Sequence, residues 1–108
     1  MEKSRFSLRR RDRLCIIAEI LTASNEVAPK GDIMREANLS SLQFGLYIGA
    51  LQDLGLIERR LKRKRFEYKT TEKGTRYLQI YNEVVRFLAP SISEHLLHAH
   101  SQVVFLAR

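Results

Sequence analysis

Four residues at positions 38–41, Asn-Leu-Ser-Ser, separate two segments with helical spacing of apolar residues, and this break most constrains the fold. The first segment covers residues 30–37, and the second runs over residues 40–55. Asn38 can adopt the left-handed conformation that ends a helix, and Ser40 can cap the helix that follows. The sequence therefore predicts two helices joined by a tight turn, which is a helix-turn-helix.

The second of these helices has two contrasting faces. Phe44, Tyr47, Ile48 and Leu51 form an apolar face predicted to lie in the core, and Gly55 is placed to end the helix. The segment contains no Lys or Arg, and its only charged residue is one aspartate. The outward face consists of Ser41, Leu42, Gly45, Leu46, Gly49 and Gln52.

Elements on both sides of the helix-turn-helix follow from similar patterns. We expect a first helix from Arg11 or Asp12 to Ser24, with Asp12 as its cap. Two extended runs, 56–61 and 66–70, enclose the basic sequence Lys-Arg-Lys-Arg and predict a β-hairpin. In the first helix, the residues expected to face the core are Leu14, Ile17, Ala18 and Leu21.

A long helix is expected after the hairpin. Thr71 can cap its start, apolar residues then recur at helical spacing, and Pro90 is expected to end or kink it. Helix, short helix, helix, hairpin and helix is the order of a winged helix, a mainly α fold with a small β-hairpin (α+β). The predicted divisions are a basic N-terminal arm (1–11), a winged-helix domain (12–70, with the wing at about 56–70), a long dimerisation helix (71–89) and a partly helical tail (90–108).

Positive charge is concentrated at two places in a chain whose formal net charge is +7. Residues 1–13 hold six Lys or Arg against two carboxylates, and residues 58–69 hold seven against two. Lys and Arg displace condensed counterions from phosphates, so clustered positive charge suits a polyanionic partner. Solubility is the alternative explanation of such patches. The fold and the charge together favour double-stranded DNA as the partner.

Other classes find less support in the sequence. The apolar runs are too short to span a membrane, and the N-terminus lacks the apolar region of a signal peptide. The single cysteine, Cys15, fits a reducing compartment, so we expect a cytoplasmic, nucleoid-associated protein. We find no catalytic motif and predict neither an enzyme nor a cofactor. His95, His98 and His100 form a cluster that we interpret as ordinary surface histidines, with no metal expected.

Three motifs in this order resemble a known family. They are Ile-Met-Arg-Glu-Ala-Asn-Leu-Ser at 33–40, Leu-Gln-Asp-Leu-Gly-Leu-Ile at 51–57 and Tyr-Lys-Thr-Thr-Glu-Lys-Gly at 68–74. Residues 12–89 thus resemble archaeal winged-helix proteins of the small chromatin-protein type and related archaeal regulators. The resemblance implies a DNA-binding homodimer that pairs through its last long helix. Two features differ from the family pattern: the apolar, uncharged outward face of the third helix and the four-residue basic wing without glycine.

Several groups of residues are candidates for these contacts. In the wing they are Lys62, Arg63, Lys64 and Arg65, which can follow phosphates or enter a minor groove. In the recognition helix they are Ser40, Ser41, Leu42, Gln43, Gly45 and Leu46. In the arm they are Arg9, Arg10 and Arg11. In the dimer interface they are Tyr77, Leu78, Tyr81, Val84, Val85 and Leu88.

The sequence thus predicts a homodimer that binds double-stranded DNA with full or partial sequence specificity and regulates transcription. Two alternatives remain open. One is an architectural chromatin protein that coats DNA without reading its sequence. The other is a protein-interaction module that uses the apolar face of the third helix.

Overall fold

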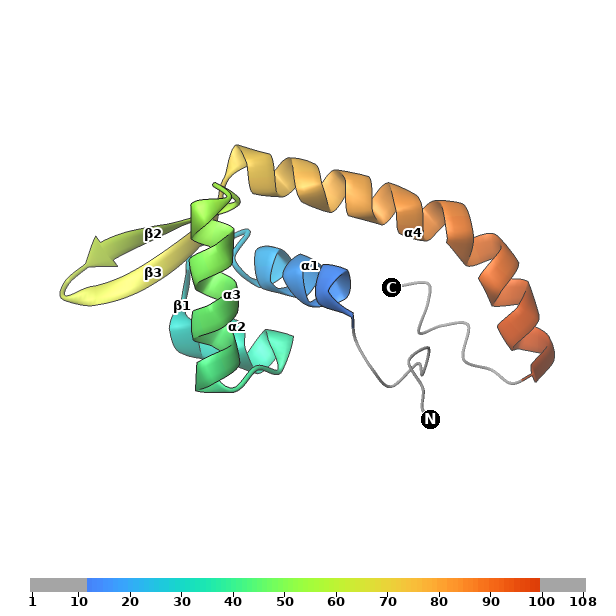
Figure 1. Ribbon diagram of the computed structural model, residues 1–108, viewed down its shortest axis with the longest axis horizontal. Coiled ribbons are helices and arrows are strands. Elements are labelled where there is room, and N and C mark those ends of the chain that lie inside the picture. Colours follow the sequence, from blue (N-terminus) through green and yellow to red (C-terminus); the bar gives the residue numbers. More distant parts are fainter. Residues whose placement is uncertain (1–11, 100–108) are drawn as a thin grey trace. The chain divides into compact units, whose positions relative to one another are not determined.

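The computed structural model describes the backbone of residues 12–99 and the side chains of residues 12–88. Contacts divide the chain into two compact units, and the division falls inside the last helix, between Leu78 and Gln79. Figure 1 shows the order of the elements along the chain. They are α1 (Arg13–Ala23), β1 (Ala28–Pro29), α2 (Lys30–Ala37), α3 (Ser41–Asp53), β2 (Ile57–Lys62), β3 (Arg65–Thr70) and α4 (Glu72–Ala99).

The turn between α2 and α3 forms as predicted. Asn38 is left-handed, with φ of 55°, and the N–H of Leu39 donates to the carbonyl oxygen of Met34 at 2.9 Å. The N–H of Gln43 donates to Ser40 Oγ at 3.1 Å, and the N–H of Ser40 donates to Gln43 Oε1 at 2.9 Å. This reciprocal pair is a capping box, so local sequence sets both ends of the turn.

Gly55 ends α3, as predicted, and directs the chain into the hairpin. Its φ is 78°, a left-handed value that residues with a Cβ seldom adopt. The N–H of Gly55 donates to the carbonyl oxygen of Gln52 at 3.0 Å, and the N–H of Leu56 donates to that of Leu51 at 2.9 Å. These two bonds form a Schellman motif, which connects α3 directly to β2.

The sheet has three antiparallel strands in the order β1-β3-β2. Strand β1 is not predicted by the sequence pattern. Its two residues end at Pro29, directly before α2, and the strand forms only because β3 lies alongside it. Phe66, Tyr68 and Thr70 share one face, as predicted, and the Tyr68 ring packs edge-on against Phe44 of α3 with centroids 5.4 Å apart.

One expectation about the core is wrong. Leu14 was expected to face the core, but 58% of it is exposed. Ala18 and Leu21 are buried as expected, and Ile17 packs against the core. Ile16 and Ile20 are buried as well, because α1 packs against α2 and the packing decides which residues of the helix are covered. The expected core residues Phe44, Ile48 and Leu51 of α3 are buried, and Tyr47 packs at the edge of the core.

Two buried hydroxyl groups connect α1 to the end of β3. Ser24 Oγ and Thr70 Oγ1 lie 2.9 Å apart, and both residues are almost completely excluded from solvent. Thr70 Oγ1 also lies 2.7 Å from the carbonyl oxygen of Leu21, and the N–H of Thr70 donates to the carbonyl oxygen of Ser24 at 2.8 Å. Because buried polar groups are stable only when they are paired, this network fixes β3 against the end of α1.

The start of α4 packs closely on the same unit. Thr71 Oγ1 accepts from the N–H of Gly74 at 3.1 Å, which confirms the predicted cap. A Cβ at Gly74 would collide with the backbone oxygen of Leu56, so only glycine fits there. The phenol of Tyr77 donates to the carbonyl oxygen of Leu14 at 2.8 Å. Burial raises the pKa of this phenol, with smaller contributions from Asp12 and Cys15, so it remains a donor at neutral pH.

Pro90 was expected to end or kink the last helix, and the ending is wrong, because α4 continues to Ala99. A proline inside a helix removes one backbone hydrogen bond but does not require the helix to end. The division predicted at 89–90 therefore does not coincide with the end of a helix.

The buried hydroxyl network leads to a test of stability. Thr70→Val keeps the side-chain volume but removes the hydroxyl that donates to the carbonyl of Leu21, and it leaves Ser24 Oγ with only the carbonyl oxygen of Ile20 as a partner. We expect a loss of about 1–3 kcal/mol in the free energy of unfolding, measured by urea denaturation with circular dichroism. Thr22→Val, the same change at an exposed position of α1, should shift it by about 0.5 kcal/mol or less. Equal effects of the two substitutions would contradict the role of the network.

Candidate nucleic-acid interface

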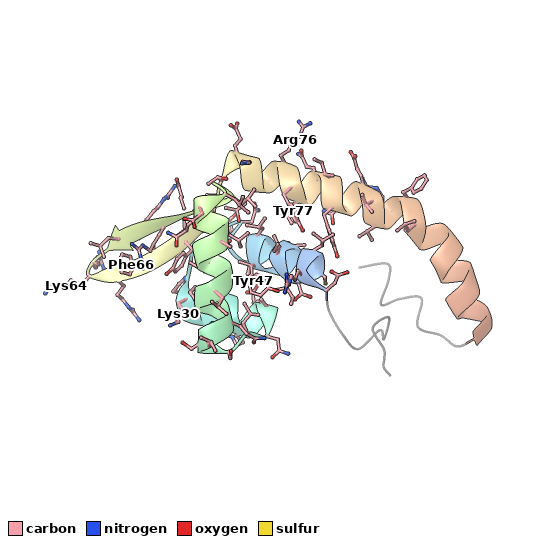
Figure 2. The ribbon with its side chains drawn as sticks, viewed as in Figure 1. Lys30, Tyr47, Lys64, Phe66, Arg76 and Tyr77 are labelled. Carbon is pink, nitrogen blue, oxygen red and sulfur yellow. The ribbon has the colours of Figure 1, made fainter. Side chains whose placement is uncertain are left out.

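The hairpin of β2 and β3 brings four cations together at its tip. The last pair of the ladder is Lys62 with Arg65, so the turn contains only Arg63 and Lys64. Both turn residues are left-handed, with φ of 52° and 68°. A two-residue hairpin turn of this conformation favours Asn-Gly, since left-handed backbone is unfavourable for residues with long side chains. Figure 2 shows Lys64 at the far end of the hairpin.

The charge of this tip is not neutralised within the described part of the chain. All four residues are exposed. The two ion pairs found among the described residues are Arg35 with Asp32 and Arg60 with Glu58, each at 2.7 Å. Arg60 lies on the opposite face of β2 from Arg59, because neighbouring residues of a strand point to opposite sides. The tip thus presents a concentrated positive potential to solvent.

A groove of about 580 Å³ lies between α3 and the inner face of the hairpin. Two of its cations lie over aromatic rings. The guanidinium carbon of Arg59 is 4.1 Å from the centroid of Phe66, and Lys30 Nζ is 5.6 Å from that of Phe44. The groove is lined by Pro29, Lys30, Gly31, Phe44, Gly45, Ile48, Gly49, Gln52, Arg59, Arg65, Phe66 and Tyr68.

The N-terminal end of α3 offers fewer free polar groups than the sequence indicates. Ser40 and Gln43 bond to each other in the capping box, so a two-point contact of Gln43 with adenine would require it to leave that box. Leu42 and Leu46 are 73% and 67% exposed, and they form an apolar patch next to the glycines of the groove. The end of α3 that was predicted to read bases is therefore mainly apolar.

The residues assigned to a dimer interface fall into two groups. Tyr77 and Leu78 pack against the core of their own unit. The more exposed apolar residues lie further along α4, where Phe87 is 82% exposed. Sequence reasoning included Val84 and Leu88 but missed two other exposed residues, Ile80 and Phe87, although their helical spacing was available.

Sequence reasoning also missed three residues of the groove. Arg59 and Phe66 lie on the face of the hairpin that continues toward Tyr68, and strand alternation was a signal that could have found them. Lys30 could not have been found in this way, since its position over Phe44 depends on where the tertiary fold places the start of α2 relative to α3.

Two groups of predicted residues fall outside the described part of the structure. The arm residues Arg9, Arg10 and Arg11 lie outside the described residues, as do the side chains of the His95, His98 and His100 cluster. Within the described part of the chain, no group of three potential metal ligands comes together. No helix found there has the length and apolarity needed to cross a membrane.

A helix-turn-helix followed by an antiparallel hairpin and a further helix defines a winged-helix protein. The comparison with protein families agrees, and the chain belongs to the winged helix-turn-helix family, whose model matches residues 10–88. No curated protein sequence matches the chain significantly.

Two solved structures from Sulfolobus solfataricus share the fold. One is Sso10a-2, described as a DNA-binding protein, with a TM-score of 0.67 and 22% identity over 91% of this chain and 98% of the other. The second is the transcriptional regulator BldR, with a TM-score of 0.64 and 24% identity over 75% of this chain. The match spans 59% of BldR, so BldR contains a substantial part without a counterpart here.

The hairpin turn provides a test of its local conformation. Replacing Arg63 by Asn and Lys64 by Gly removes the backbone strain at two left-handed positions. We expect this pair of changes to raise the free energy of unfolding by about 1 kcal/mol, measured by thermal or urea denaturation. Replacing the same two residues by Gln removes the same charges without favouring the turn, so it should give no such gain. An equal gain in both variants would attribute the effect to charge repulsion.

Proposed function

We propose that this protein binds double-stranded DNA as a homodimer and regulates transcription in the cytoplasm of an archaeon. The main support for this proposal is the exposed positive charge at the hairpin tip. Four exposed cations lie there, and two of them occupy left-handed positions where Asn and Gly would fit with less strain. Stability alone does not explain Arg and Lys at such positions, whereas attraction to phosphates does.

The wing and the arm supply the electrostatic part of binding in this proposal. Lys62, Arg63, Lys64 and Arg65 contact phosphates or a minor groove, and Arg9, Arg10 and Arg11 add contacts from the arm. The helix α3 lies against the duplex with Ser40, Ser41, Leu42, Gln43, Gly45 and Leu46. The DNA-binding description of Sso10a-2 and the regulator description of BldR support this assignment, since both share the fold.

Dimerisation through α4 completes the proposal. Ile80, Val84, Phe87 and Leu88 recur at the spacing of one helical face, and each is at least 46% exposed. Pairing this face with its copy would bury apolar surface, and a two-fold dimer presents two wings at a fixed spacing. In this arrangement the contact is centred on Val84 and Phe87. Tyr81 and Val85 lie at its edges, and Tyr77 and Leu78 support the helix from within their own unit.

Salt dependence tests the role of the wing. Replacing all four wing cations by Gln should lower affinity for every duplex sequence. It should also reduce the slope of log K against log salt by about 0.9 for each phosphate that the wing neutralises, measured by fluorescence anisotropy. Arg35 and Arg60 are already paired with carboxylates, so replacing these two by Gln is the control and should change the slope little. An unchanged slope in the wing variant would exclude the wing from binding.

The dimer is tested by a charge on α4. Phe87→Glu places a carboxylate in the proposed interface, so we expect the mass found by sedimentation equilibrium to fall from that of a dimer to that of a monomer. Asn82→Glu adds the same charge outside the stripe and should leave the dimer intact. A wild-type protein that sediments as a monomer would contradict dimerisation.

An architectural role without sequence reading is the second candidate. It is favoured by the capping box, which occupies Ser40 and Gln43, and by the apolar character of the exposed residues on α3. Selection from a pool of random duplexes separates the two functions, because a regulator recovers a sequence motif and an architectural protein does not. A protein-interaction module would instead fail to bind duplex DNA at physiological salt and would release its partner when Leu42 and Leu46 become Glu.

A further inference from the structure

The groove between α3 and the hairpin carries charge of a single sign. Lys30, Arg59 and Arg65 contribute three cations from separate elements. Among the described residues that line the groove, none is Asp or Glu, and Gln52 is the only amide. A groove with this lining attracts an anionic occupant along its whole length.

The way the cations are held leaves them able to bind an anion. Arg59 stacks over Phe66, and stacking uses the flat face of the guanidinium, so the N–H groups in its plane remain able to donate. Arg60, the next residue along β2, is instead paired with Glu58 on the opposite face of the hairpin. Two adjacent arginines therefore differ, and the one that stacks on an aromatic ring faces the groove.

The floor of the groove allows a ligand to approach the backbone closely. The chain has five glycines, and the fold requires two of them: Gly55 is left-handed, and a Cβ at Gly74 would collide with Leu56. Gly31, Gly45 and Gly49 have no such requirement, since a Cβ built on each meets no atom within 4 Å. All three line the groove. Glycine inside a helix such as α3 lowers its stability by about 1 kcal/mol relative to alanine. The glycines therefore leave the surface open at the expense of helix stability.

We infer that this groove holds one sugar–phosphate strand of duplex DNA, an inference that rests on the proposed DNA-binding function. Such a strand alternates anionic phosphates with apolar deoxyribose rings. The phosphates meet Lys30, Arg59 and Arg65, and the sugars pack on Phe66 and on the helix backbone exposed by the glycines. Arg65 also belongs to the cationic tip, so the groove and the tip form one continuous surface for the strand.

With a strand in this groove, α3 has a different role from that of a base-reading helix. A helix that packs its glycine-lined side against the DNA backbone contributes to position and affinity, and these contacts carry no sequence information. Because Gly45 and Gly49 have no side chains, the backbone of α3 can approach the strand closely. Larger side chains would hold the duplex away from Lys30 and Arg59.

Glycine substitutions test the groove directly. Gly45→Ala and Gly49→Ala should raise the melting temperature, because they add helix propensity in free space, and yet weaken binding of a 25-base-pair duplex by several fold. Gly49→Leu should weaken it by about tenfold or more, measured by fluorescence anisotropy. Ala50→Leu adds bulk at the next position, which is exposed but outside the groove lining, and should leave affinity within about twofold.

Charge substitutions provide a second, independent measurement. Arg59→Ala should lower the salt slope by about 0.9, the value for a single neutralised phosphate, whereas Arg60→Ala should change it much less. If the wild-type protein binds duplex DNA while Gly49→Leu and Arg59→Ala bind equally well, the strand lies elsewhere. The groove assignment then fails, and the proposed function stands. If the wild-type protein binds no duplex and instead binds poly-glutamate through Arg59, both assignments fail and the groove is a site for acidic peptides.

Discussion

The arrangement of the whole winged-helix unit depends on the hydrogen-bonded contact between Ser24 and Thr70. This contact joins the end of α1 to the end of β3 with two buried hydroxyls and a backbone hydrogen bond. Because unpaired buried groups are costly, β3 can meet α1 in only one register. That register places Tyr68 against Phe44 of α3 and leaves the outer half of the hairpin uncovered. The groove and the cationic tip are both consequences of this placement.

Local departures from optimal stability are concentrated at the proposed binding surface. Arg63 and Lys64 adopt left-handed backbone at the tip, and Gly45 and Gly49 lie within a helix where the fold has room for a side chain. Within residues 12–78 the local rules otherwise agree with the fold, as in the capping box at Ser40. Agreement across a fold with exceptions at one surface is the pattern expected where function opposes stability. The exceptions and the concentrated positive charge coincide at the hairpin and the groove beside it.

Local signals predicted much of the fold and part of the site. The cap at Asp12, the left-handed Asn38, the stop at Gly55 and the hairpin around residues 62–65 follow from residue chemistry within a few positions. Strand β1 could not be predicted, since a two-residue strand exists only through its neighbour. The exposure of Leu14 was missed because helix packing selects the buried face. Of the end or kink expected at Pro90, the end does not occur, because the loss of one hydrogen bond is tolerated within a long helix.

The sequence by itself determined the order of the elements, their caps and turns, and the clustering of positive charge at the hairpin, because these depend on neighbours along the chain. Only the tertiary structure decided which exposed groups share a surface. It placed Lys30 of α2, the glycines of α3 and Arg59 of β2 around one groove, and it packed the partly buried Tyr77 against the core of its own unit. Such contacts join residues far apart in sequence. They are set by how helices and strands pack, which no local pattern specifies.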